Sequence, residues 1–200
     1  SIYEPPNLRG ASHFIEHMLF KGTKNKPTPQ EISKLVDSYG GYFNASTSRN
    51  ITNYIVKIPS AHIDTAIDVL TDMVANPLFR AKDIKAEKKV VIEEIKRYKD
   101  NPSYYIEDII YRLVFKKHPL QHDIGGKACI INNYTKTNVK DYFKKYYVLN
   151  NCIICYCGNI SKKKIIHKLN ESFLKSIPKR TILSKFKDIP KQCKPRSCII

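Results

Sequence analysis

The stretch His13-Phe14-Ile15-Glu16-His17 places two imidazoles and one carboxylate within five residues. In a helix, residues three and four positions apart share one face, so all three polar side chains would point toward one spot. Neutral imidazoles are good zinc ligands, and a carboxylate held beside the metal, but not on it, can take a proton from water. These five residues alone leave two interpretations open: a metal site, or a chance meeting of His and Glu on a solvated helix face.

The residues on both sides of this stretch extend the pattern. Arg9-Gly10-Ala11-Ser12 leads into it, and residues 18–23 (MLFKGT) follow it. Together, residues 9–23 resemble the signature of the M16 family of inverzincin zinc metallopeptidases, the group of pitrilysin, insulin-degrading enzyme and the mitochondrial processing peptidase. The resemblance implies a zinc metalloendopeptidase that binds one Zn²⁺ per chain through His13 and His17. It also implies that Glu16 is the general base for a zinc-activated water.

The resemblance also implies a third metal ligand on a later helix. In the M16 family this ligand is a Glu about 76 residues beyond the second His, and 76 residues separate His17 from Glu94 here. Successive helical residues point about 100° apart, so only one of Glu93 and Glu94 can face the metal, and the family pattern selects Glu94. Glu87, two turns earlier on the same face, matches a further acidic position, so we place it in the catalytic group as a support for the ligands.

Apolar and polar residues alternate over residues 42–48 and again over residues 52–58, which predicts a pair of strands. On this pattern alone, an ordinary hairpin is the favoured interpretation. Residues 41–48 (GYFNASTS) also resemble the M16 strand beside the zinc, where a peptide substrate adds as an extra strand through main-chain hydrogen bonds. Given that resemblance, Asn44, Ala45 and Ser46 become candidate substrate-binding residues.

The remaining patterns mix helices and strands without strict βαβ alternation, which predicts an α+β fold with a largely antiparallel sheet packed with helices. The resemblance narrows this to an M16 half-domain of the LuxS/metallopeptidase-like type, from which the first strands are missing. We expect a catalytic domain over residues 1–175 and a basic linker or tail over residues 176–200. The helices are expected near residues 10–20, 28–39, 60–75, 81–99, 103–115, 138–147 and 162–173, with a buried strand at 150–157.

The formal net charge of +17 is concentrated in the last third of the chain, where residues 130–200 hold 16 Lys and Arg but three acidic residues. A basic surface can attract nucleic acid or an anionic membrane. No nucleic-acid motif accompanies the charge, and no apolar run approaches the roughly 18 to 20 residues of a membrane helix, so we expect neither partner. The expected partners are a peptide or unfolded protein substrate and, from the resemblance, a second M16-like half-domain or subunit.

Three of the six cysteines, Cys152, Cys155 and Cys157, lie in one apolar stretch. A second zinc site would need further ligands at suitable spacing, so we expect reduced thiols buried in a core strand. Such thiols indicate an intracellular, reducing compartment. A different class of function also stays open: a non-catalytic M16-like peptide-binding or assembly subunit, for which a broken motif would be the mark.

Overall fold

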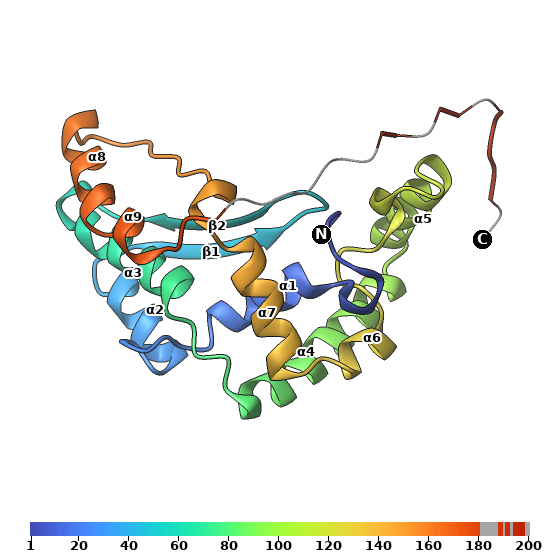
Figure 1. The fold of residues 1–200 in the computed structure, drawn as a ribbon, viewed down its shortest axis with the longest axis horizontal. Helices are drawn as coiled ribbons and strands as arrows, with labels where there is room; N and C mark the ends of the chain where they lie inside the picture. Colours follow the sequence, from blue (N-terminus) through green and yellow to red (C-terminus); the bar gives the residue numbers. More distant parts are fainter. Residues whose placement is uncertain (181–187, 190, 193, 199–200) are drawn as a thin grey trace.

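A computed structural model describes residues 1–180, 188–189, 191–192 and 194–198 of the 200-residue chain, which are rich in helix and carry one antiparallel pair of strands (Figure 1). This arrangement confirms the predicted α+β class. The first elements are η1 Pro6–Leu8, α1 Ala11–Leu19, α2 Pro29–Asp37, β1 Tyr42–Thr47, β2 Thr52–Lys57, η2 Ser60–His62, α3 Ile63–Ala75, α4 Ala81–Asp100 and α5 Pro102–Val114. The later elements are η3 Pro119–Gln121, α6 Ala128–Asn132, α7 Lys136–Tyr146, η4 Leu149–Asn151, α8 Lys162–Glu171 and α9 Phe173–Ser176.

Helix α1 lies below the sheet and is surrounded by β1, α4 and α7, as Figure 1 shows. Its apolar residues recur with helical spacing, so one face of the helix is buried in the core while the opposite face remains available for polar side chains. The buried residues on this helix are Ala11, Ser12, Phe14, Ile15, Met18 and Leu19.

The two strands bury one face and expose the other, as alternation requires. The pairs Phe43–Val56, Ala45–Tyr54 and Thr47–Thr52 face inward, and the residues between them are exposed. Helices α1, α2 and α3 contact this hairpin, so the inner side chains are packed against helices. The side chains on this inner face therefore lie on the side of the sheet where α1 is packed.

The predicted buried strand at residues 150–157 is wrong. Leu149–Asn151 form a short 3-10 helix, residues 152–157 belong to no strand, and Ile153 is 89% exposed. Cys152, Cys155 and Cys157 are exposed free thiols rather than core residues. A strand is stabilised by hydrogen bonds to a neighbouring strand, and within the described ranges no strand pairs with this segment.

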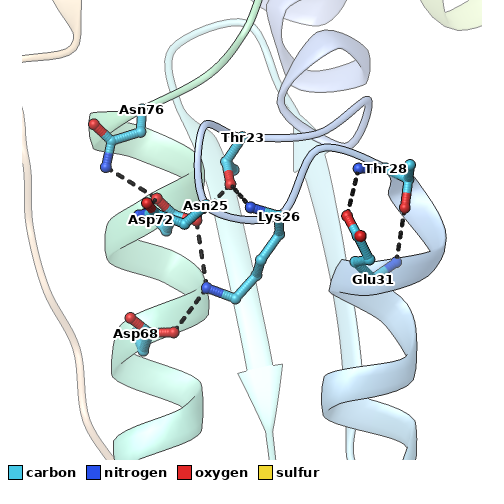
Figure 2. Close-up of polar contacts among 8 residues, drawn as sticks. All are labelled: Thr23, Asn25, Lys26, Thr28, Glu31, Asp68, Asp72 and Asn76. Atoms are coloured by element: carbon cyan, nitrogen blue, oxygen red, sulfur yellow. Dashed lines mark hydrogen bonds and ion pairs between the residues drawn. The ribbon is translucent and has the colours of Figure 1, made fainter.

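The loop after α1 is tied to α3 by a buried carboxylate, that of Asp72 (Figure 2). Thr23 donates a hydrogen bond to Asp72 Oδ2, and the amide groups of Asn25 and Asn76 donate to Oδ1 at 2.7 and 2.9 Å. Lys26 adds its ammonium at 3.3 Å and also reaches the exposed Asp68 at 2.8 Å. Burial acts to raise the pKa of Asp72, but these hydrogen bonds outweigh it and leave that pKa lowered.

The second helix begins where its sequence predicts. Thr28 accepts a hydrogen bond from the Glu31 amide at 3.3 Å, and the Glu31 carboxylate accepts from the Thr28 amide at 2.9 Å (Figure 2). This reciprocal pair is the capping box expected from a Thr followed three residues later by a Glu. In the described part of the chain, no helix has both the length and the apolar character that a bilayer crossing requires.

We predict that Asp72→Ala destabilises the chain by about 3–5 kcal/mol, because it leaves a buried hydroxyl and an ammonium without their shared acceptor. Asp68→Ala is the matched control, since Asp68 pairs with the same Lys26 but its side chain is 63% exposed. Asp68→Ala should lower the free energy of unfolding by less than about 1 kcal/mol. Urea unfolding of the two variants would measure both changes, and equal losses would contradict the role given to burial.

Candidate metal centre

The face of α1 opposite the core presents the three polar residues of the motif. His13, Glu16 and His17 are partly buried, while the residues between them, Phe14 and Ile15, have no exposed surface. Burial of the apolar face therefore fixes the rotation of the helix about its axis. The two imidazoles and the carboxylate therefore face the space between α1, α4 and β1.

The N-terminus of α1 is held by a carboxylate from the preceding loop. Glu4 Oε2 accepts a hydrogen bond from the Gly10 amide at 2.7 Å, and Oε1 accepts from the Ser12 amide at 2.8 Å. A negative charge is favourable at this end of a helix, where amide groups lack partners within the helix. Gly10 has a φ of +93°, and a Cβ there would lie 2.5 Å from the carbonyl oxygen of Gly125, so only glycine fits this approach.

Helix α4 presents its acidic residues to α1 along one face. Ile84, Glu87 and Val91 are buried at helical spacing, and Glu94 continues the same face. Glu93 points away, has a side chain that is 66% exposed and pairs with a lysine of its own helix. The structure therefore brings Glu94, and not Glu93, next to the two histidines.

Three ligand atoms meet between the two helices. His13 Nε2 lies 3.1 Å from His17 Nε2, His17 Nε2 lies 3.3 Å from Glu94 Oε2, and His13 Nε2 lies 3.7 Å from the same oxygen. Among the described residues, these are the three that could hold a metal ion together. Bond lengths of roughly 2.0–2.1 Å to a tetrahedral zinc ion place its ligands roughly 3.3 Å apart, so this donor set fits zinc in spacing and in chemistry.

Glu87 lies behind His17 and bonds to its other ring nitrogen. Glu87 Oε1 is 2.8 Å from His17 Nδ1, and Glu87 Oε2 is 2.6 Å from Lys21 Nζ. Burial acts to raise the pKa of Glu87, but the hydrogen bonds with His17 and Lys21 outweigh it and leave the carboxyl ionised at lower pH. A carboxylate in this position fixes the orientation of the imidazole and leaves Nε2 directed at Glu94.

The two imidazoles differ in charge when no metal is bound. Burial, followed by repulsion from His17, lowers the pKa of His13 to about 4. Burial also acts to lower the pKa of His17, but hydrogen bonds to Glu87 and Glu94 raise it to about 9. His13 is therefore a neutral ligand at neutral pH, whereas a cation bound at His17 Nε2 would displace a proton.

Glu16 lies beside this group without belonging to it. Its Oε2 accepts a hydrogen bond from the hydroxyl of Thr47 on β1. Burial raises the pKa of Glu16, and this effect exceeds the opposing effect of the Thr47 hydrogen bond. A carboxyl group with a raised pKa binds a proton more readily, which suits a general base.

A cavity of about 350 Å³ opens over these side chains. Ala45 and Ser46 of β1 line it together with the two histidines, Glu16 and Glu94, whereas Asn44 does not. Instead, the Asn44 amide group donates to the Tyr42 hydroxyl at 2.7 Å. Of the three residues expected to bind substrate, the structure therefore places two at the cavity.

Sequence reasoning missed three residues that belong to this site. Thr47 contacts Glu16, Lys21 contacts Glu87, and the buried Arg49 lines the cavity while pairing with Asp108 at 2.9 Å. Thr47 could have been found, because it follows Ala45 on the inward face of the same strand. No local signal marks the ion pairs, whose partners are 66 and 59 positions apart in the sequence.

Comparisons with solved structures agree with this architecture. A protease from Helicobacter pylori is similar over 95% of this chain and 44% of its own, with a TM-score of 0.83 and 28% identity. Pitrilysin is similar in fold over 98% of this chain and 21% of its own, with a TM-score of 0.75 and 21% identity.

Proteins related in sequence are also named as proteases or peptidase subunits. An uncharacterized zinc protease, YmxG of Bacillus subtilis, is 36% identical over 90% of this chain and 41% of its own length. A probable mitochondrial-processing peptidase subunit beta of Arabidopsis thaliana is 28% identical over 88% of this chain and 33% of its own. The chain thus spans less than half the length of these relatives. The family model for insulinase (peptidase family M16) matches residues 1–127, and that for the peptidase M16 inactive domain matches residues 133–200. The chain therefore belongs to the M16 peptidase family.

Proposed function

We propose that this chain is the catalytic part of a zinc metalloendopeptidase. His13, His17 and Glu94 would hold one Zn²⁺, with Glu87 supporting His17 from behind. The observation that carries the proposal is the set of three ligand atoms at 3.1, 3.3 and 3.7 Å, beside the carboxylate of Glu16, which is outside the set. The similarity to YmxG of Bacillus subtilis, which is named as a zinc protease, supports this proposal.

The reaction follows from the positions of these side chains. When bound, zinc would lower the pKa of a coordinated water toward about 7 and polarise the scissile carbonyl. Glu16 would take a proton from the attacking water and pass it to the departing amine, a role for which its raised pKa is suitable. Glu87 would keep the His17 ring in the orientation that directs Nε2 into the site.

The substrate would be a peptide or an unfolded protein segment that binds in extended form. Within the described residues, β1 pairs with β2 alone, so one edge of β1 has no partner strand. A peptide could add there through main-chain hydrogen bonds, with Ala45 and Ser46 at the cavity and Asn44 farther along the strand. These three residues would then contact the substrate through their backbone groups.

A second half-domain or subunit is part of the proposal. The chain covers 41% and 33% of the two sequence relatives, and the described residues leave the cavity beside β1 partly open. Another M16-like half could close over the peptide and exclude water, which strengthens electrostatic interactions in the site. Cys129, Cys152, Cys155 and Cys157 carry free, exposed thiols, and this favours a reducing compartment.

Glu16→Gln should abolish most turnover while leaving zinc in place. Because the amide cannot accept the proton, we expect peptide cleavage to fall by about 10²- to 10⁴-fold. The measurement is cleavage of a fluorogenic peptide library by the zinc-loaded chain and by the variant, with the zinc content of each determined by atomic absorption. A variant that cleaves as fast as the parent would refute the role of Glu16.

The same experiment separates the enzyme from the non-catalytic alternative. Cleavage by the parent but not by Glu16→Gln would establish that the chain is active alone. If neither chain cleaves and both retain zinc, the chain by itself is a binding or assembly module, and activity would have to be sought with a second half-domain added.

Three substitutions on α4, Glu87→Gln, Glu94→Gln and Glu93→Gln, should differ in their effect on zinc affinity. Glu87→Gln should weaken binding by roughly 10- to 100-fold, the usual effect of removing a carboxylate that orients a ligand. Glu94→Gln should weaken it further, because a direct ligand loses its charge. Competition with a chromophoric chelator would measure all three affinities.

Glu93→Gln is the matched control for this series. It changes the neighbouring residue in the same way, but its side chain is exposed and faces away from the histidines. Its zinc affinity should equal that of the parent. An unchanged affinity in Glu94→Gln, or a loss in Glu93→Gln, would require a different third ligand.

A further inference from the structure

A chain of hydroxyl groups leads from Glu16 into the interior of the protein. It begins with Thr47, whose hydroxyl donates to Glu16 Oε2 and lies 3.3 Å from the hydroxyl of Thr52. These two threonines are partners in the register of β1 and β2. The contact between their side chains therefore depends on the hairpin pairing, which the backbone maintains independently.

Two tyrosine hydroxyls form a second pair next to the threonines. Tyr54 shares the inward face of β2 with Thr52, and its hydroxyl lies 3.0 Å from that of Tyr147. Burial raises the pKa of both phenols, so both keep their protons. This pair links β2 to the residue that follows α7.

The carboxylate at the end gives the chain a direction. An ionised carboxylate only accepts hydrogen bonds, and each hydroxyl has one proton to donate. Since Thr47 gives its one proton to Glu16, Thr52 is the donor in the contact between the two threonines. Donors aligned in this way strengthen one another.

We propose that Thr47 is a positioning residue for Glu16, and that the hydroxyl chain behind it holds Oε2 so that Oε1 is the oxygen that accepts the proton. This inference rests on the proposed function, in which Glu16 is the general base. It ties the base on α1 to the strand that would hold the substrate, because Thr47 and the cavity residues Ala45 and Ser46 are consecutive in β1. A peptide that binds along β1 is thereby aligned with the base.

Thr47→Val is the informative substitution. It removes the hydroxyl but keeps the β-branched shape that suits a strand. We expect kcat for peptide cleavage to fall by roughly 10- to 100-fold, since misplacing a catalytic group has effects of this size, while KM and zinc affinity stay near the parent values. Thr47→Ser, which keeps the hydroxyl, should restore most of the loss.

Thr71→Val is the matched control. Thr71 is buried where Thr47 is partly buried, its hydroxyl has no hydrogen-bond partner in the described structure, and it lies on α3, away from the site. The substitution removes a hydroxyl with the same change of shape, so cleavage should not change. A kcat of Thr47→Val equal to that of the parent, or a loss that Thr47→Ser fails to restore, would overturn the proposal.

A second measurement needs no turnover. A threonine hydroxyl proton bound to a carboxylate exchanges slowly with water, so NMR should detect one such resonance that is missing in Thr47→Val and shifted in Glu16→Gln. If no protected resonance depends on both residues, the positioning contact is absent. If the resonance behaves as expected in a chain that does not cleave, the contact stands and the proposed activity of this chain alone is what fails.

Discussion

The packing of α1 against α4 is the constraint on which the rest of the structure depends. Both helices bury apolar residues in the same core, Phe14 and Ile15 from one and Val91 from the other. Because protein cores are close-packed, the helices cannot slide or rotate without opening voids. The polar residues next to these positions, such as His13 and Glu94, are therefore held at fixed separations by apolar contacts that take no part in the chemistry.

The charges of the site follow from this packing. It gathers the carboxylates of Glu16, Glu87 and Glu94 around two imidazoles, and the ammonium of Lys21 pairs with Glu87. Carboxylates brought together in a partly buried space repel one another. In the metal-free chain the pKa of His17 is raised, so its ring carries a positive charge that reduces this repulsion. A divalent cation at the same place would reduce the repulsion among the carboxylates further. The electrostatics and the ligand spacing therefore both favour a metal site.

Three contacts hold the side chains of the candidate site in place. Glu4 anchors the start of α1, Glu87 orients His17, and Thr47 holds Glu16. Each of these contacts comes from a different segment of the chain, so the site is fixed from three directions. Sites supported in this way keep their geometry when a substrate binds, because the rotamers of the reacting side chains are already selected.

The sequence by itself determined what depends on short-range geometry. The spacing within residues 13–17 places three polar side chains on one face of α1. Because successive helical residues point about 100° apart, only one of Glu93 and Glu94 can face α1. The capping box at Thr28 and the α+β class were equally local signals. Such features are predictable because a helix or a strand fixes directions over a few residues.

Only the tertiary structure decided the contacts between distant segments. The strand expected at residues 150–157 failed, although its sequence suits a strand, because its formation depends on a neighbour that alternation does not reveal. The hydroxyl of Thr47 meets Glu16 across 31 residues, and Lys21 meets Glu87 across 66. Those pairs exist because the core sets how α1, α4 and β1 pack, and no spacing along the chain encodes that choice.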